Sequence, residues 1–482
     1  MASNGIVQLS VPQFYGINQA QERVAMGYAT RAENIDTRYG KLQSAAGFSA
    51  YTPDLGEAII TLARFHRRFY SPASERDVLV AATATKIYVL VEGAQSPEWK
   101  LVYSTATSGS WDYVAYEDYR DNAETPVDIL LMTNAQDGMI SIWGDNLTAS
   151  IVETPAKFGA LTRYKERIFG TAATGEPDRI WYSAPFNPRD WEQNATIPED
   201  GGGFLDYPTW DGDSFIALRP FGSYLLAFKQ RMICIVSGAD PGEFTIREGY
   251  GTDGPLSENT VDINETAAFF LATSGIGLFD GNTIKMLSRD IISAIASRIN
   301  INAISTASAA IHDGVYCCAV PLDQSTVPNA IIEYDTERGT FMLRTGFTVG
   351  SLCSSGNGAL LLTTVKSPDR VCLWGQGEDY DGEPVHAIWE SPWTDMDAKE
   401  TTKSGFRIRC LAEGSGPIDF SIQTERKTKT KTIPIPTPET VKKKPVQKNI
   451  SNRGRQFRFK IESSTRFSIP TGLQIETELD SD

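Results

Sequence analysis

Histidine and cysteine are scarce in this sequence, and the short motifs that often build active sites are missing. Of the 482 residues three are His and six are Cys, and no two cysteines follow a CxxC spacing. The patterns GxSxG, HExxH and GxxxxGK[ST] are also missing. The sequence therefore offers no recognisable nucleophile elbow, zinc centre or phosphate-binding loop. We predict no catalytic residue, no metal ligand and no cofactor.

Long apolar runs are missing too. No stretch of 18 apolar residues occurs, so we expect no membrane-spanning helix. The opening MASNGIVQLSVPQF has neither a charged n-region nor an apolar h-region, and we expect no targeting signal. Most cysteines lie in predicted strands, where adjacent Cys317 and Cys318 would point to opposite faces. Buried, reduced thiols are expected, which suits assembly in a reducing cytoplasm.

The sequence does contain a loose repeat of short apolar strands separated by polar turns. Its clearest copy is residues 267–288, AAFFLATSGIGLFDGNTIKMLS, in which three apolar runs are cut by Gly, Asp and Asn. Such runs form antiparallel meanders, which need neighbours to be stable. Comparable pairs of runs recur, and we place the first strands near residues 79, 129, 167, 225, 269, 315 and 359. Recurrence at about 40–50 residues is typical of a β-propeller.

We predict an all-β chain with a β-propeller of about seven blades, followed by a small C-terminal β-sandwich-like module. The shortest and longest gaps, 38 and 58 residues, leave six or eight blades open. Residues 1–50 form an N-terminal extension and hairpin that we expect to anchor on the first blade. The propeller takes residues 51–398, and the C-terminal module residues 399–482. Isoleucines at helical spacing predict one helix over residues 290–299.

Charge is divided unevenly between these parts. Residues 399–482 carry 17 Lys and Arg against 10 Asp and Glu, a net charge of +7. The preceding 398 residues carry 28 against 50, a net charge of −22. The basic excess is concentrated in residues 425–452, where the prolines of IPIPTP predict an extended or disordered loop. This loop is either merely solvated or contacts DNA phosphates or an acidic partner. Its candidate contact residues are Arg426, Lys427, Lys429, Lys431, Lys442, Lys443, Lys444 and Lys448.

A long excursion over residues 173–214 interrupts the third repeat. Function is often concentrated in long loops. Its aspartates lack the twelve-residue calcium-loop pattern, so we expect turn chemistry there and no bound metal. As candidate interface residues we select Phe186, Arg189, Trp191, Trp210 and Asp211.

Four groups of residues, in their order along the chain, carry a family resemblance. The first group is Ala32, Asn34, Asp36, Gly40, Leu42, Gly47 and Phe48. The others are IWYSAP with NPRDW at 180–191, IGLFDG at 276–281, and YD with GTF at 334–341. Together they resemble the nozzle, or packaged-DNA stabilisation, proteins of short-tailed bacteriophages, which have a β-propeller body. The resemblance covers most of residues 10–400.

The resemblance implies a structural virion protein of the phage tail, assembled in the host bacterial cytoplasm. It implies a homo-oligomeric ring, with a hexamer favoured, that retains packaged DNA and forms the conduit for its ejection. The implied partners are the portal and adaptor ring, tail fibre or spike proteins, and genomic DNA in transient, non-specific contact. The competing interpretation is a glycan-active propeller, either a polysaccharide hydrolase or a lectin-like receptor-binding protein. Such a hydrolase would need two carboxylates, and the sequence alone does not single out a pair.

Overall fold

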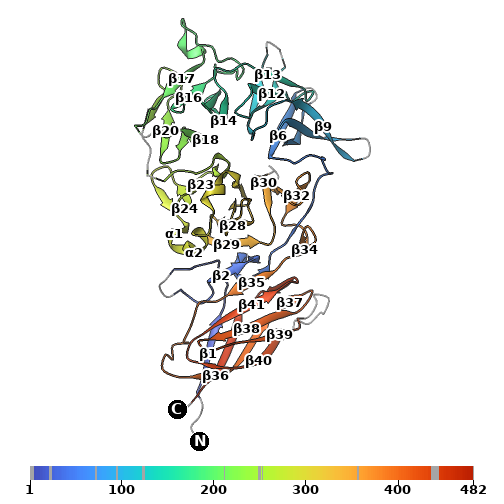
Figure 1. Cartoon of the computed structure of the whole chain (residues 1–482), viewed down its shortest axis with the longest axis vertical. Helices are drawn as coiled ribbons and strands as arrows, with labels where there is room; N and C mark the ends of the chain where they lie inside the picture. The colour runs from blue at the N-terminus through green and yellow to red at the C-terminus, as the bar shows by residue number, and fades with distance from the viewer. Residues whose placement is uncertain are drawn as a thin grey trace.

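The computed structural model describes residues 5–20, 24–70, 73–93, 96–121, 125–210, 212–247, 251, 253–354, 358–435 and 445–480. Strands dominate these ranges, and helices are confined to single turns. Among these residues no helix has the length and apolar character needed to span a bilayer. The molecule is elongated, with the propeller at one end and a β-sandwich and both termini at the other (Figure 1).

Seven antiparallel blades of four strands make up the propeller in the described part of the chain. The first blade consists of β6 (Thr61–Tyr70), β7 (Ala73–Ala82), β8 (Lys86–Glu92) and β9 (Pro97–Ser104). The second consists of β10 (Asp112–Tyr119), β11 (Val127–Thr133), β12 (Met139–Trp143) and β13 (Ala149–Val152). The third consists of β14 (Phe158–Tyr164), β15 (Arg167–Ala172), β16 (Arg179–Tyr182) and β17 (Gly203–Asp206). The fourth blade consists of β18 (Phe215–Phe221), β19 (Tyr224–Lys229), β20 (Ile233–Ser237) and β21 (Thr245–Arg247). The fifth consists of β22 (Asp262–Ile263), β23 (Ala268–Ala272), β24 (Gly275–Phe279) and β25 (Ile284–Met286). The sixth consists of β26 (Ser308–His312), β27 (Val315–Val320), β28 (Ala330–Asp335) and β29 (Thr340–Thr345).

The seventh blade joins two distant parts of the chain. Its first three strands are β30 (Val349–Ser354), β31 (Leu360–Thr364) and β32 (Val371–Trp374), and its fourth strand is β5 (Phe48–Ala50) from the N-terminal region. β30 also contacts β6 of the first blade, so the innermost strands of the blades form a closed circle. The N-terminal region therefore attaches to the last blade, whereas we expected it on the first. The predicted hairpin is present as β3 (Ile35–Asp36) and β4 (Leu42–Ser44).

The propeller prediction is confirmed, but the predicted first strands are the second strand of every blade. The seven predicted positions fall on or beside β7, β11, β15, β19, β23, β27 and β31. These second strands are mostly apolar on both faces, because they are packed between neighbouring blades; β15 and β27, for example, are buried at every residue, whereas the first half of β7 is polar and exposed. The innermost strands line the propeller axis and carry polar residues, so their pattern is weaker.

The C-terminal module is a sandwich of two sheets. One consists of β1 (Ile6–Val11), β43 (Leu473–Leu479), β36 (Lys403–Leu411) and β40 (Pro445–Gly454). The other consists of β35 (Ala387–Glu390), β41 (Phe457–Ser463), β38 (Ile418–Thr424) and β39 (Thr428–Ile433). Their inner faces share one apolar core, in which the rings of Phe406 and Phe457 lie 4.9 Å apart. The sandwich-like module predicted from the alternating pattern is confirmed.

One continuous sheet links the sandwich to the propeller. β2 (Arg31–Glu33) lies between β29 of the sixth blade and β35, so nine strands run from one body into the other. A smaller sheet of β3, β4, β42 (Phe467–Ile469) and β37 (Glu413–Gly414) adds a second connection. Trp389 of β35 is fully buried here, with its ring 5.3 Å from that of Phe14. The two bodies are therefore joined by paired backbone and a shared core.

The helix predicted over residues 290–299 is wrong in length. The structure has two separate turns, α1 (Ser288–Ile291) and α2 (Ser293–Ala296), interrupted at Ile292 (φ −128°, ψ 36°). Ile292 is fully buried and Ile295 nearly so. The spacing of the isoleucines therefore indicates that this segment is buried. Its packing against the propeller interrupts the helix.

The cysteine prediction is confirmed in both respects. All six cysteines are buried and none forms a disulfide. Cys318 belongs to the core shared by the propeller and the sandwich, and Cys317 to the core beside the seventh blade. The two neighbours thus point to opposite faces of β27.

Candidate functional site

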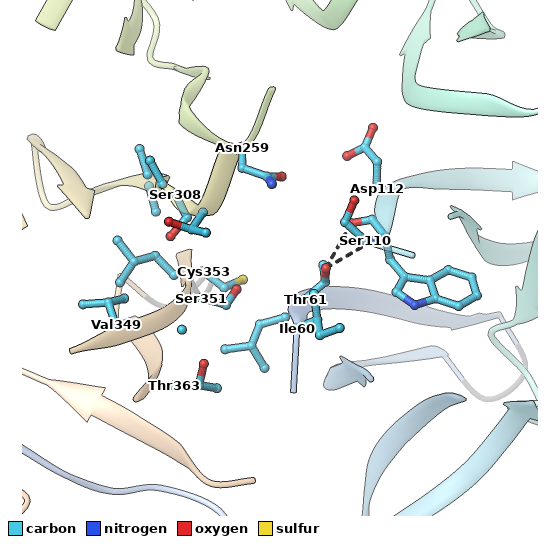
Figure 2. A pocket seen from close by; sticks show the side chains of 18 of the residues that line it. Ile60, Thr61, Ser110, Asp112, Asn259, Ser308, Val349, Ser351, Cys353 and Thr363 are labelled. Carbon is cyan, nitrogen blue, oxygen red and sulfur yellow. Dashed lines mark hydrogen bonds between the residues drawn. The ribbon is translucent and has the colours of Figure 1, made fainter. Parts of the chain in front are cut away.

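A cavity of about 710 Å³ lies on the propeller axis, lined mainly by the first strands of the blades. Figure 2 shows Thr61, Asp112, Asn259, Ser308 and Thr363 around the same space. Concave sites where several polar groups converge are the usual places for ligands. This cavity is therefore the first candidate site.

Its lining is built from hydrogen bonds that join one blade to the next. In the first blade, Thr61 Oγ1 donates to the carbonyl oxygen of Trp111 at 3.1 Å. In the second blade, the Asp112 carboxylate accepts from the backbone N–H of Leu161 at 2.7 Å. Each contact links the start of an inner strand to its neighbour. Polar residues at these positions therefore help to close the ring.

The same arrangement recurs on the other side of the axis. Arg219 Nε donates to the carbonyl oxygen of Val261 at 3.2 Å. The Asp262 carboxylate accepts from the backbone N–H of Ile311 at 2.7 Å. Asp112 and Asp262 are each the first residue of an inner strand, so the two aspartates play equivalent structural roles.

Two carboxyl groups of the lining, Asp112 and Asp262, and the nearby carboxyl group of Glu258 share the field of the Arg219 guanidinium. Burial, assisted by the nearby Asp112 carboxyl, raises the pKa of Glu258 to about 8 against the opposing effect of Arg219. Burial also raises the pKa of Asp112, opposed chiefly by Arg219. Burial raises the pKa of Asp262 as well, against two backbone N–H donors. At neutral pH Glu258 is therefore mostly protonated and can donate a hydrogen bond.

Two buried hydroxyl groups complete the lining. Ser308 Oγ and Thr363 Oγ1 have no hydrogen-bond partner in the described structure. Such groups are usually satisfied by water or by a ligand. Within the described ranges, no three or more His, Cys, Asp or Glu side chains are arranged to hold a metal ion. The cavity can therefore hold a neutral or weakly charged polar molecule through hydrogen bonds.

The described part of the predicted basic loop over residues 425–452 is mainly strand, which corrects the sequence analysis. β39 and β40 lie in it, paired to β38 and β36 respectively. The ladder forms because the alternating Thr and Lys of β39 suit an edge strand, while Pro434 falls after its end and Pro445 begins β40. Three predicted contact residues, Lys442, Lys443 and Lys444, lie outside the described residues.

The remaining predicted cations gather at the open edge of the sandwich. Lys429 and Lys431 are exposed on β39, opposite buried Ile422 and Phe420 of β38. Directly opposed residues share a face, so both lysines lie on the inner face of their sheet at its margin. Lys448, opposite Ile408, lies likewise on the inner face of β40.

The strands β39 and β40 contact each other across this edge. Arg426 and Lys427, in the turn before β39, are exposed as well. Among the described residues, no carboxylate forms an ion pair with Lys427, Lys429, Lys431 or Lys448. We call these five side chains, Arg426, Lys427, Lys429, Lys431 and Lys448, the basic edge.

The five predicted interface residues of the excursion do not form one surface. Trp191 is buried, with its ring 4.8 Å from that of Phe158. Arg189 lies over the ring of Trp143 at 5.3 Å, close to the Asp121 carboxylate. Nothing in the residue pattern indicated that these two side chains pack against the blades.

Phe186 and Trp210 are exposed, at 69% and 99%, but they lie at opposite ends of β16. The Phe186 N–H bonds Glu166 beyond the end of that strand, while the chain just before Trp210 is bound to Asp178 at its start. Asp211 lies outside the described residues. The excursion therefore presents two separate surfaces.

Two buried cations that the sequence analysis missed hold this excursion in place. The Arg167 guanidinium, 2% exposed, donates to the carbonyl oxygens of Ser183 at 2.7 Å, Gly201 at 2.6 Å, and Glu199. Burial lowers the pKa of Arg167, and among the described residues no carboxylate forms an ion pair with it. Its signal in the sequence is a cation at the start of the apolar run RIFG.

Lys229 performs the same task at the other end. Its ammonium group, fully buried, lies 2.5 Å from the Asp178 carboxylate and donates to the carbonyl oxygens of Tyr207 and Asp213. The excursion is thus anchored at both ends by cations that project from strands of the propeller. Its surface is preorganised.

Comparisons with known proteins identify no family for this chain. No protein-family model matches the chain, and no curated protein matches it. Among solved structures it is similar to the WD40 domain of Pan2 from Neurospora crassa, at 11% identity, covering 71% of this chain and 97% of that domain, with a TM-score of 0.41. It is also similar to the AfRom2 CNH domain, at 10% identity, covering 69% and 97%, with a TM-score of 0.39. Both are β-propeller domains.

Proposed function

We propose that this chain is a structural subunit of a short phage tail, a nozzle that forms a ring, retains packaged DNA and conducts its ejection. The observation that carries the proposal is the position of the first resemblance motif. Its residues lie at the joint between the propeller and the sandwich. A structural subunit of an assembly requires a fixed orientation between its propeller and its sandwich more than it requires a catalytic cleft.

Asn34 is the centre of that joint. Its side chain donates to the carbonyl oxygens of Thr345 at 3.0 Å and His386 at 2.8 Å. It accepts from the Thr345 N–H at 3.0 Å and from the Tyr380 hydroxyl at 3.1 Å. Asn34 is 2% exposed and adopts a positive φ of 54°. One buried amide with all its hydrogen bonds formed thus fixes the N-terminal segment to both bodies.

The conduit in this proposal lies between subunits and not inside one propeller. The axial cavity of about 710 Å³ has the volume of a small-molecule site, which typically measures about 300–1,000 Å³, and it does not admit duplex DNA. Several copies around a common axis would enclose a wider channel. The net charge of −22 on residues 1–398 suits such a wall, because acidic groups repel phosphates and let DNA slide.

Electron microscopy of the purified protein, with and without the portal and adaptor rings of its phage, tests the proposal. Closed rings that bind below the adaptor are expected. Particles that remain monomeric in both conditions would overturn it. Replacing Asn34 by Leu should loosen the joint and reduce ring formation, whereas Asn282→Leu, at an exposed turn of the fifth blade, should leave it intact.

The axial carboxyl groups favour a second candidate, a glycan-active propeller. Glycoside hydrolases pair a protonated acid with an ionised carboxylate, and Glu258, whose pKa is raised to about 8, supplies a carboxyl group of the protonated kind within the field of Asp112. Turnover of a host surface polysaccharide, lost in Glu258→Gln, would support this function. Equal behaviour of the variant and the wild type on such substrates would remove it.

A further inference from the structure

An acidic surface at the propeller end of the molecule is complementary to the basic edge of the sandwich. Glu192, Glu199 and Asp200 are exposed on the loop over residues 192–200, and none forms an ion pair with a described residue. Ile197 within this loop is 48% exposed, and Phe186, six residues before Glu192 in the chain, is 69% exposed. We call this surface, Phe186, Glu192, Ile197, Glu199 and Asp200, the acidic loop.

The acidic loop is held rigidly for an exposed segment. Asn194 Oδ1 accepts from the backbone N–H groups of Thr196 and Ile197, each at 3.0 Å. The Gly202 N–H donates to the carbonyl oxygen of Glu192 at 2.7 Å, which closes the base. Buried Arg167 holds the carbonyls of Glu199 and Gly201 from below. A partner would therefore meet a surface that loses little entropy on binding.

Phe186 is held in the same way. It has a positive φ of 58°, a conformation that a bulky side chain rarely adopts. Its N–H donates to the carbonyl oxygen of Glu166 at 2.9 Å, which fixes it against the β14–β15 hairpin. Strain of this kind persists where the surroundings impose it and is frequent at binding sites. The exposed ring is a suitable apolar anchor among the acids.

The two charged surfaces cannot meet within one molecule. The third blade, with β16 and β17, lies at one end of the long axis, and β39 lies at the other end (Figure 1). The basic edge also has features that suit a protein partner. In the described part of the chain β39 is the last strand of its sheet, and no aromatic residue alternates with its lysines to stack on bases.

We propose that the basic edge of one copy docks on the acidic loop of a second copy, with Phe186 and Ile197 as apolar anchors. Because the two surfaces differ, this contact is heterologous, and a suitable rotation between copies closes it into a ring. The inference deepens the proposed function, since it names the interface on which the nozzle ring would depend.

Charge reversal with exchange tests this interface. The variants are Lys427→Glu/Lys429→Glu/Lys431→Glu on the basic edge and Glu192→Lys/Glu199→Lys/Asp200→Lys on the acidic loop. Sedimentation velocity over a range of protein concentrations measures self-association at low and high salt. Each triple variant should weaken association at least about tenfold, and an equimolar mixture of the two should restore it, because the charges are then opposite again.

The control is the triple variant Lys41→Glu/Lys100→Glu/Lys157→Glu, which makes the same change of net charge at exposed lysines elsewhere. It should associate like the wild type. A near-native circular dichroism spectrum and melting temperature verify that each variant folds. Phe186→Ser supplies an uncharged variant, which should also weaken association.

The outcomes separate this interface from the proposed function. Wild-type rings that survive both reversals overturn the interface and leave the nozzle proposal standing. Association that follows the charge exchange but gives open chains supports the interface and counts against the ring. Another outcome is that the basic-edge variant no longer retards duplex DNA on a gel while its self-association is unchanged. In that case the basic edge binds nucleic acid and the interface is overturned. A wild type that is monomeric at every concentration and salt also overturns it.

Discussion

The Arg344 guanidinium and the Glu333 carboxylate form a buried ion pair between β29 and β28, with Nη2 2.6 Å from Oε2. Both side chains are at most 6% exposed. Arg344 also donates to the carbonyl oxygen of Ile35 at 2.9 Å. The pair therefore connects the sixth blade to the N-terminal hairpin at the joint.

Removing one member of this pair should be costly. Arg344→Met leaves the Glu333 carboxylate buried without its partner, and we expect a loss of about 3–5 kcal/mol in unfolding free energy. The double variant Arg344→Met/Glu333→Leu should recover much of that loss, because no uncompensated charge remains. Urea denaturation of the three proteins measures the difference. Equal stability of the single variant and the wild type would contradict the assigned role.

Gly47 tests how closely the chain packs at the same joint. A Cβ atom there would lie 1.9 Å from the carbonyl oxygen of Asp379, and the backbone must move to admit it. Gly47→Ala should therefore destabilise the protein by about 1–3 kcal/mol. Gly159→Ala is the control, since its Cβ would be 3.6 Å from the nearest atom, an ordinary contact. The melting temperatures of both variants test this prediction, and equal melting temperatures would contradict it.

The raised pKa of Glu258, about 8, makes a prediction about pH. The folded state holds this proton to a higher pH than the unfolded chain does. Stability is therefore fully present below the ordinary glutamate pKa and is lost as the pH rises toward about 8. Glu258→Gln stays neutral throughout, so it should match the wild type near pH 4 and be more stable at pH 8–9, by on the order of 2 kcal/mol.

Melting temperatures of the wild type and Glu258→Gln across pH 4–9 provide the measurement. Exposed Glu265→Gln serves as the matched control. A stability difference between the wild type and Glu258→Gln that does not change with pH would show that Glu258 is not held in its protonated form.

Arg167 should control the order of the excursion. Arg167→Met removes the donors of three backbone carbonyls, and we expect a loss of about 1–3 kcal/mol in stability. The main effect should be local, as faster cleavage by a protease within residues 192–202. The control is Arg163→Met on the same blade, which loses partly exposed ion pairs with Glu166 and Glu117 and a contact with the Tyr116 ring, but no hydrogen bond to the excursion. Identical digestion of the two variants would argue against this role of Arg167.

The sequence was sufficient to predict the strongest part of the repeat. Second and third strands such as AFFLA and GIGLF carry apolar residues on both faces, because blades cover them on both sides. Inner strands were harder to find, since β22 has only two residues, one of them the polar Asp262. The closing strand β5, with three residues, resembles any short loop segment until its partner β32 is known.

The site was less predictable than the fold for a physical reason. Arg167 acts on backbone carbonyls that lie 16 to 34 residues away, and backbone acceptors leave no mark in a sequence. The axial carboxyl groups come from two separate blades, Asp112 from the second and Glu258 and Asp262 from the fifth, and they meet only when the ring closes. By contrast, the basic residues were found readily, but their proline-rich surroundings concealed two strands.

The placement of β5 in the seventh blade has a consequence for biosynthesis. The ribosome makes this strand more than 300 residues before its partner β32. β1 waits still longer, since it pairs with β43. Both early strands must therefore remain unpaired, yet protected from wrong strand partners, until these partners are made. The seventh blade and the sandwich can close only then, which makes their closure a late event in folding.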